Sequence, residues 1–241
     1  MRYGRALAAL IVALAGVAGA EPGPVQRYSA DWVVTSQGLS QTWRVLVDGP
    51  RMRADLEAYQ LVDLQLYACP QRAVVRHDLK QIGLVVPYKR VYEEFAYDPA
   101  VDLADLDQRE GVEKLGAESV GGESATKYRA TQDGDTVLFW LATADGVLLK
   151  ASSPRTPGYA LEVRNLKRGP QAASAFELPE GFARVDRKGE AASDVANILL
   201  SSIVPSLGSL MQSGQVETLS AEERAGVLRE CRAVELDLFN R

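Results

Sequence analysis

The pattern that most constrains this chain is an alternation of apolar and polar residues, interrupted by turn residues every eight to twelve positions. In residues 27–34 the apolar side chains occupy even positions, and in residues 42–48 they occupy odd positions. A period of two is typical of strands that bury one face. Turn pairs such as Gly121-Gly122 and Asp145-Gly146 separate the alternating segments, which predicts meandering antiparallel strands rather than βαβ units. Further strands are expected at residues 62–68, 73–77, 82–86, 89–95, 112–120, 124–131, 136–141, 147–152 and 159–167.

Beyond residue 190 the sequence changes from a strand pattern to a helix pattern. Residues 190–212 are rich in Ala, Leu, Ile and Ser and carry few charges, with apolar residues at helical spacing. Ser220-Ala221-Glu222-Glu223 matches a capping box, which predicts a second helix with Leu228 and Cys231 on its apolar side. We therefore expect an α+β protein, with a sheet domain over residues 21–185 and a helical segment over residues 186–241 that packs on the sheet.

The first twenty residues have the pattern of a secretory signal peptide. Arg2 and Arg5 precede an apolar run over residues 6–17, and Ala18-Gly19-Ala20 is a small-residue cleavage site. We expect cleavage after Ala20 and export of the remaining chain; the alternative is an uncleaved N-terminal anchor. No other stretch is continuously apolar over the ~18 residues of a transmembrane helix, because the uncharged run of residues 195–216 is interrupted by serines, glutamines and Pro205, so the exported chain is not expected to span a membrane.

The charge and histidine content exclude several function classes. Lys and Arg total 27 against 32 Asp and Glu, which gives a formal net charge of −5. An acidic chain lacks the basic face that neutralises phosphates, so nucleic acid is not an expected partner. A single histidine argues against His-based catalytic triads and multi-His metal sites.

Cys69 and Cys231 are the two cysteines of the chain and lie far apart in the sequence. Thiols of exported proteins tend to be paired. We predict a disulfide that ties the C-terminal helix to the sheet; the alternative is two buried free thiols that pack as small apolar side chains. No Cys-x-x-Cys pair is present, which argues against a redox enzyme.

The sequence offers few catalytic candidates. His77, beside Arg76 and Asp78, is either a general base or a surface histidine on a strand. Ser124 and Lys127 have the S-x-x-K spacing of penicillin-binding enzymes, but that chemistry needs both residues on one face of a helix, and on a strand they point to opposite faces. The companion motifs are absent. We expect no enzymatic activity and no cofactor.

Four carboxylates lie close together in the sequence: Asp102, Asp105, Asp107 and Glu110. Such a cluster could bind Ca²⁺, but it lacks the spaced glycine and the terminal glutamate of an EF-hand loop. A solvated acidic loop is the simpler interpretation, so no metal site is predicted.

Two phrases of the sequence resemble a known family. Residues 115–128 contain the pattern G-x-E-x-V-x-G-x-x-A-x-x-Y, followed by Trp140, Asp145-Gly146 and Lys150, and residues 176–182 read F-E-L-P-E-G-F. Over residues 28–185 the chain is similar to the LolA/LolB-like superfamily of bacterial envelope proteins, which includes outer-membrane lipoprotein-sorting proteins. The resemblance implies an incomplete, strongly curved antiparallel β-barrel covered by helices on its concave side. It also implies a periplasmic location and the binding of acyl chains or lipid-modified proteins, without catalysis.

A curved sheet with one apolar face must cover that face, and the covered face is the candidate binding site. Residues 196–204 contain no charged residue, so we expect the helix around residues 195–204 to lie across the concave face, with Leu199 and Ile203 contacting a ligand. The inward-facing residues predicted from the alternation are Trp32, Trp43, Val45, Val47, Leu64, Leu66, Ile82, Leu84, Val86, Leu138, Trp140 and Leu149.

The sequence is consistent with two functions. If the cover is tight, the inward-facing residues form a filled core; if it is loose, they line a cavity. The first function is therefore a periplasmic binding protein for a lipid, an acyl chain or a lipoprotein-like hydrophobic ligand. The second is an envelope scaffold or sensor module whose sheet edge or acidic face docks a partner protein.

Overall fold

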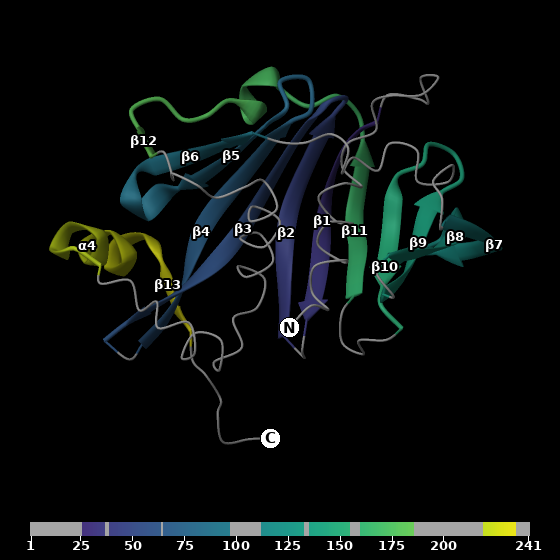
Figure 1. Cartoon of the computed structure of the whole chain (residues 1–241), viewed down its shortest axis with the longest axis horizontal. Coiled ribbons are helices and arrows are strands. Elements are labelled where there is room, and N and C mark those ends of the chain that lie inside the picture. The colour runs from purple at the N-terminus through teal and green to yellow at the C-terminus, as the bar shows by residue number, and fades with distance from the viewer. Residues whose placement is uncertain are drawn as a thin grey trace, which may run out of the picture.

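The computed structural model describes residues 26–36, 39–63, 65–96, 112–132, 135–154, 160–185 and 219–234. Within them lies a strongly curved, open sheet of 13 strands with one α-helix, α4 (Ala221–Glu230), as Figure 1 shows. The α+β class predicted from the sequence is confirmed. The signal segment, the acidic residues 98–110 and the expected cover helix with Leu199 and Ile203 lie outside the described residues.

The strands follow the order β12-β6-β5-β4-β3-β2-β1-β11-β10-β9-β8-β7 across the sheet, and β13 pairs with β4 off this path. Neighbouring strands in the described sheet are antiparallel, except β12 and β6, which are parallel. Most neighbours are also consecutive in the chain, as closely spaced turn signals predict. The strands are β1 (Arg27–Ser36), β2 (Leu39–Asp48), β3 (Arg51–Val62), β4 (Gln65–Arg76), β5 (Gln81–Val86), β6 (Val91–Ala96), β7 (Val112–Val120), β8 (Glu123–Gln132), β9 (Asp135–Ala142), β10 (Leu148–Ser152), β11 (Ala160–Arg168), β12 (Ala183–Val185) and β13 (Arg232–Val234).

The turns fall mostly at the predicted positions, but the break predicted between the strands at residues 62–68 and 73–77 is absent, because β4 runs continuously from Gln65 to Arg76. The sequence predicts a strand over residues 62–68, and this is wrong: β3 ends at Val62, the chain turns at Asp63, and β4 begins at Gln65. Asp63 has φ 49°, a left-handed conformation that aspartate tolerates better than most residues. Gly121 and Gly122, with φ of 59° and 86°, form the predicted two-residue turn, where positive φ matches the twist of a hairpin.

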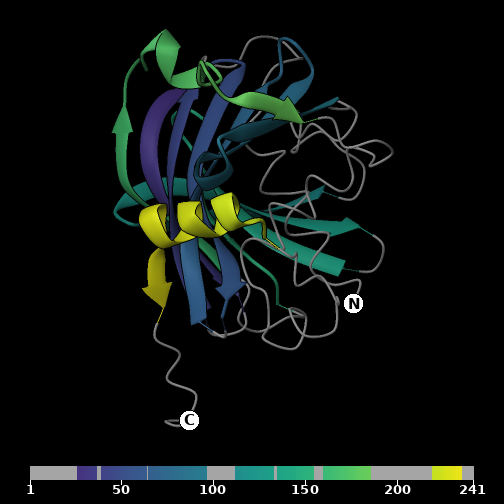
Figure 2. The same ribbon diagram turned by 90° about the vertical axis from the view of Figure 1, so that its left-hand side faces the viewer.

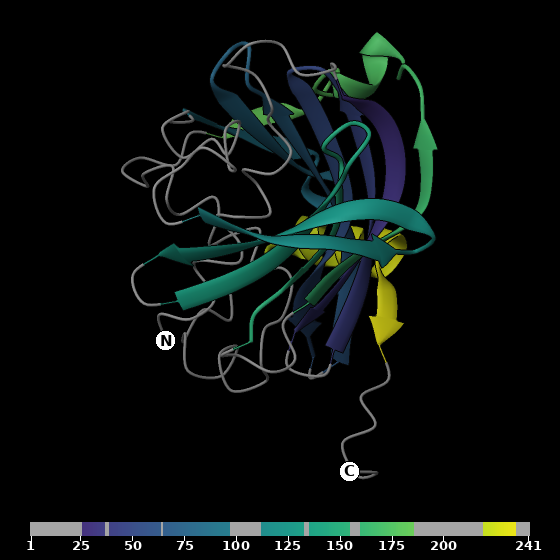
Figure 3. The ribbon, with the colours of Figure 1, turned by 90° about the vertical axis from the view of Figure 1, so that its right-hand side faces the viewer.

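One face of the sheet is apolar from β1 to β5. Direct antiparallel partners lie on the same side of a sheet. We call this side the concave face, because the arm formed by β7 to β10 bends over it and crosses the first strands at a steep angle (Figures 2 and 3). On the arm, the ring of Phe139 stacks on Tyr128 with centroids 5.2 Å apart. The cross-strand partners that connect the concave face from β1 to β5 are Trp32–Trp43, Val45–Ala54, Ala54–Ala73 and Ala73–Leu84.

After β11 the chain crosses the opposite, convex face. The short helix η4 (Ala173–Phe176) packs over β3, and the chain continues to β12 at the far edge of the sheet. Phe176 is buried beneath the Arg51 guanidinium, which lies 5.1 Å from the ring centroid. A Cβ on Gly83 would meet Leu178 Cδ2 at 2.6 Å. The segment F-E-L-P-E-G-F therefore has a structural role: it connects β11 to β12 and packs on β3 and β5 along the way.

Helix α4 packs against β4 and the short helix η1 (Pro87–Lys89) on the concave side (Figure 2). The predicted capping box is confirmed: Ser220 Oγ accepts from the Glu223 N–H at 3.2 Å, and Glu223 Oε2 accepts from the Ser220 N–H at 2.9 Å. Leu228, predicted on the apolar side, is 54% exposed, because the helix docks through Gly226 and Val227 instead. Nowhere in the described ranges is a helix long and apolar enough to cross a membrane.

Candidate functional site

The concave face brings together most of the side chains that the sequence predicts as lining residues. Val86 is on the same face, in a smaller buried cluster beneath α4. Leu64, Leu199 and Ile203 lie outside the described residues. The predicted residues that belong to the main buried cluster are Trp32, Trp43, Val45, Val47, Ile82, Leu84, Trp140 and Leu149, and Leu138 packs against it.

By strand register, the side chains of three predicted lining residues point to the convex side of their strands: Leu66, Leu138 and Trp140. The partner of Trp140 is Lys150, which is opposite Glu162 on β11. Glu162 in turn is opposite Val33, the neighbour of Trp32 that points to the other side of β1. By this register, the Trp140 side chain points away from the side of the sheet that carries Trp32.

The surroundings of Trp140 account for its burial on the convex face. Lys127 Nζ and Lys150 Nζ each lie 5.0 Å from a centroid of the indole. The indole N–H donates to Glu118 Oε2 at 2.7 Å, and Lys127 donates to Glu118 Oε1 at 2.8 Å. The hydrogen bond from Lys127, followed by that from Trp140, lowers the pKa of Glu118. Cation–π contacts and a shared carboxylate thus hold Trp140 as a structural residue.

Trp32 has a buried polar atom on the concave face that lacks a hydrogen-bond partner among the described residues. Trp32 is 0% exposed, and in the described part of the chain its indole N–H has no hydrogen-bond acceptor. Its cross-strand partner Trp43 is equally buried, but the Trp43 indole N–H donates to Gln41 Oε1 at 3.2 Å. A buried group without its hydrogen bond costs about 1–3 kcal/mol, and such groups are rare in native proteins. An acceptor placed beside Trp32 would remove that cost.

Tyr28 provides a second buried donor, four residues earlier on the same side of β1. Its hydroxyl has no hydrogen-bond partner among the described residues. Burial, with a smaller contribution from the Asp145 carboxylate, raises the pKa of Tyr28 well above its ordinary value. The hydroxyl therefore stays protonated and able to donate. Positions four apart on a strand are about 13 Å apart, so an elongated molecule could reach both Tyr28 and Trp32.

The concave face carries little charge. Along the described parts of β1 to β6, Glu93, opposite Leu84, is the single charged side chain on this side. Lysine and arginine side chains of these strands fall on the convex side or at the strand ends. The face therefore suits an apolar molecule with neutral polar groups.

His77 lies in the turn between β4 and β5 and is only 9% exposed. The interpretation as a surface histidine on a strand is therefore wrong, because its backbone N–H bonds to Pro50 O at 2.9 Å and draws it against the turn between β2 and β3. Burial lowers the pKa of His77 to about 4, and the Asp78 carboxylate partly opposes this shift. The imidazole is neutral at physiological pH.

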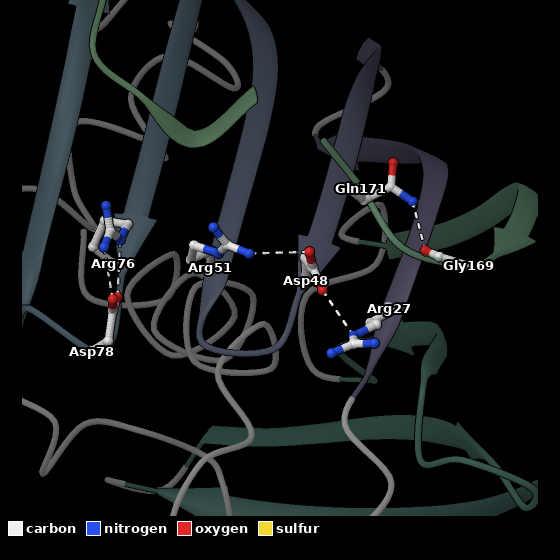
Figure 4. A network of polar contacts seen from close by, with 7 residues as sticks. All are labelled: Arg27, Asp48, Arg51, Arg76, Asp78, Gly169 and Gln171. Atoms are coloured by element: carbon white, nitrogen blue, oxygen red, sulfur yellow. Dashed lines mark hydrogen bonds and ion pairs between the residues drawn. The ribbon is translucent and has the colours of Figure 1, made fainter. Parts of the chain in front are cut away.

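A row of ion pairs holds the same end of the strands (Figure 4). Asp48 binds both Arg27, at 3.0 Å, and Arg51, at 3.1 Å. Arg76 donates two hydrogen bonds to Asp78, at 2.9 and 2.7 Å. Because Arg51 also covers the Phe176 ring, these contacts join the first hairpins to the convex crossing rather than form a ligand site.

Helix α4 closes one end of the concave face. Val227 is 0% exposed. A Cβ on Gly226 would lie 2.3 Å from the Tyr88 carbonyl oxygen, so the helix can dock this closely only with glycine there. The buried side chains that pack with Val227 are Val62, Cys69, Val86 and Tyr88.

The predicted disulfide is confirmed: Cys69 on β4 is bonded to Cys231, directly after α4, with Cα atoms 4.4 Å apart. Strand β13 then pairs with residues 66–68 of β4, while residues 72–76 of β4 pair with β5.

Surface ion pairs contribute about 0–1 kcal/mol each, and burial of one valine side chain about 1.5–3 kcal/mol. Apart from the disulfide, α4 and β13 are thus held weakly. The ion pairs around them are Lys89–Glu223, Asp63–Arg224 and Glu57–Arg232.

No protein-family model and no curated protein matches the sequence. Several solved structures do match. An uncharacterized conserved protein from Thermus thermophilus is 13% identical, with 68% of this chain and 92% of that chain covered and a TM-score of 0.49. PNGF-II is 10% identical, with 73% of this chain and 34% of that chain covered and a TM-score of 0.46. The Pseudomonas aeruginosa MucA/MucB complex is 12% identical, with 74% and 62% covered and a TM-score of 0.39.

A putative outer membrane lipoprotein-sorting protein domain from Vibrio parahaemolyticus is also matched, at 13% identity, with 62% of this chain and 88% of that domain covered and a TM-score of 0.22. The chain spans about a third of PNGF-II and less than two thirds of the matched MucA/MucB chain. These four TM-scores are below 0.5, so the function is inferred below from the residues of the chain itself.

Proposed function

We propose that this chain is an exported, non-enzymatic binding protein that holds an acyl chain or another hydrophobic ligand, such as the lipid group of a lipoprotein, against its concave face. The observation that carries the proposal is the indole N–H of Trp32, which has no acceptor among the described residues and lies within a buried apolar cluster. The signal-peptide pattern of residues 1–20 supports a periplasmic place of action.

The apolar surface can supply most of the affinity. Burial contributes about 0.8 kcal/mol per CH₂ group, so a long alkyl chain needs no charged anchor. Trp43, Val45 and Leu84 are apolar side chains of the buried cluster, on neighbouring strands, and would line the position of such a chain. A polar group at Trp32 would then fix the position of the chain along the sheet.

The charge of the concave face should determine which hydrophobic ligands bind: neutral ligands are favoured over those with a carboxylate. On the described parts of β1 to β6, no lysine or arginine is there to pair with a carboxylate, and Glu93 would repel one. Burying an unpaired carboxylate is costly. An ester or amide carbonyl accepts a hydrogen bond from Trp32 without that cost. We therefore expect a neutral acyl ester to bind better than the free fatty acid of the same length.

Titration of the full chain with a fluorescent long-chain acyl ester tests this function. Trp32→Phe keeps an aromatic ring and removes the N–H, so the affinity should fall by about 5–10-fold, as expected for one hydrogen bond. Trp140→Phe, on the convex face, is the matched control and should bind like wild type. Equal binding by wild type and Trp32→Phe, or no uptake by wild type, would contradict the proposal.

The alternative function is an envelope scaffold or sensor module without a small-molecule ligand. The observation that favours it is β7, which pairs with β8 alone in the described sheet, because a free edge can accept a strand from a partner. The irregular register next to Gly116 and the charges of Lys114 and Glu118 oppose such pairing. If wild type takes up no probe and a defined envelope protein binds through β7, this alternative replaces the first.

A further inference from the structure

We infer that the Cys69–Cys231 disulfide is a redox latch: it holds α4 over one end of the concave face, and its reduction releases α4 and opens that end. The bond joins β4 to the residue that directly follows α4. The consequence for ligand entry rests on the proposed function, whereas the release of α4 can be measured without any ligand.

Within the described part of the chain, the noncovalent contacts of α4 are few, and they include the ion pair of Glu223 with Lys89 at 3.2 Å. The helix has ten residues, of which Gly226 and Val227 are buried. Helices this short are marginal in water without tertiary support. The ion pair between Arg224 and Asp63 is largely exposed on both sides, and exposed pairs add little. Strand β13 contributes three residues of pairing with β4. The disulfide is therefore the main restraint on the position of the helix.

The surface under α4 continues the candidate binding face. Val62, Cys69 and Val86 have the same orientation as the concave residues of their strands and pack under Val227. Val86 is two residues along β5 from Leu84, which belongs to the main concave cluster. Release of α4 would therefore expose an apolar end of this face, where a ligand chain could enter along the strands.

The two cysteines differ in solvent exposure, which determines which sulfur atom a reductant attacks first. Cys69 is fully buried, whereas Cys231 is partly exposed. A thiolate of an external dithiol reductant attacks Cys231 Sγ, the Sγ–Sγ bond breaks, and Cys69 leaves as a thiolate that takes up a proton. The second thiol of the reductant then closes its own disulfide and frees the Cys231 thiol. Two electrons pass from the dithiol to the protein disulfide.

Hydrogen exchange measured by mass spectrometry on the full chain, oxidised and after reduction with dithiothreitol, tests the latch. We expect residues 221–234 to exchange on the order of tenfold faster or more after reduction, and residues 135–152 of β9 and β10 to be unchanged. Cys231→Ser should resemble the reduced protein and should not respond to dithiothreitol. Unchanged protection of residues 221–234 would overturn the inference, as would an equal loss of protection in β9 and β10, since the bond would then stabilise the whole sheet.

The association rate of a fluorescent acyl ester, measured on the same samples, separates the latch from the binding function. Faster uptake by the reduced protein supports both. Release of α4 without uptake by either form supports the latch and contradicts the binding function. Uptake at the same rate by both forms supports binding and overturns the role of α4 in ligand entry.

Discussion

Trp32 and Trp43 are direct partners across β1 and β2, yet of their two indole N–H groups only that of Trp43 has an acceptor in the described part of the chain. Both side chains are buried on the concave face. The two residues therefore differ in hydrogen bonding rather than in burial. Substitutions at the two positions separate the contribution of the aromatic ring to stability from that of the N–H hydrogen bond.

Trp43→Phe should destabilise the fold more than Trp32→Phe. Both substitutions remove the same ring volume, but only Trp43→Phe takes away a hydrogen bond, the one to Gln41. The difference between their free energies of unfolding should be about 1–3 kcal/mol. Urea unfolding followed by circular dichroism measures it. A larger loss for Trp32→Phe would show that the Trp32 N–H is satisfied in solution.

Gly226→Ala should loosen α4, although alanine favours a helix over glycine by about 1 kcal/mol. The new Cβ would lie 2.3 Å from the Tyr88 carbonyl oxygen, a backbone atom, and overpacking costs about 1–3 kcal/mol. Hydrogen exchange of residues 221–230 should therefore accelerate. Ala225→Gly, at an exposed position of the same helix, is the control without a clash. Better protection in Gly226→Ala than in wild type would contradict the close docking of α4.

Stability should fall as the pH drops from about 6.5 to about 4 because of His77. Its pKa is about 4 in the folded protein and near the ordinary 6.5 in the unfolded chain, so the unfolded chain binds the proton first. The loss can reach about 3 kcal/mol. His77 is the one histidine of the chain, and carboxylates with lowered pKa values, such as Asp78, act mainly below this range.

Urea midpoints measured between pH 7 and pH 4.5 test the role of His77. His77→Gln should flatten the dependence on pH in this range, because glutamine does not titrate. An equally steep loss of stability in the variant would assign the effect to other groups.

Phe176→Ala should lower the free energy of unfolding by about 3–5 kcal/mol, as for other buried phenylalanines. Phe176 is buried under Arg51 and fastens the convex crossing. Phe182→Ala, at a partly exposed position of the same phrase, should cost less. Uptake of an acyl ester by folded Phe176→Ala should match wild type, and a selective loss of uptake without a loss of stability would place the convex crossing in the binding site.

The curved sheet could be predicted because its signals are local. Alternation and the Gly121-Gly122 turn each depend on a few neighbouring residues. The hairpin at Asp63 could not be predicted, because no glycine stands there and residues 62–68 read as one continuous segment. Only pairing between β3 and β4, which the sequence does not display, shows that the chain reverses at this point.

The face on which a residue lies is harder to predict where a strand is apolar on both sides. In β9, Val137 and Phe139 lie on the concave side, and Leu138 and Trp140 lie on the opposite side of the strand, although all four belong to the main cluster or pack against it. A period of two separates these pairs but does not say which is inside. The lysines that cover Trp140 come from β8 and β10, so the answer depends on cross-strand register.

Trp32 was predictable as an inward residue, but its missing acceptor was not. On β2, Gln41 shares the side of Trp43 and accepts its N–H. On β1, the residues two positions from Trp32 on the same side are Ala30 and Val34, and neither side chain can accept a hydrogen bond. This contrast is visible in the sequence once the pairing of β1 and β2 is known.

The separation of 162 positions between Cys69 and Cys231 sets an order of events during synthesis of the chain. Cys69 emerges long before Cys231, so β4 can pair with β3 and β5 while its thiol is still free. With two cysteines in the chain, one intramolecular bond is possible, and no misplaced internal bond needs to be rearranged. The competing product is a covalent dimer of two chains. A monomer with an intact bond has therefore brought β4 and the residue after α4 together, and oxidation reports that these two parts of the chain are in place.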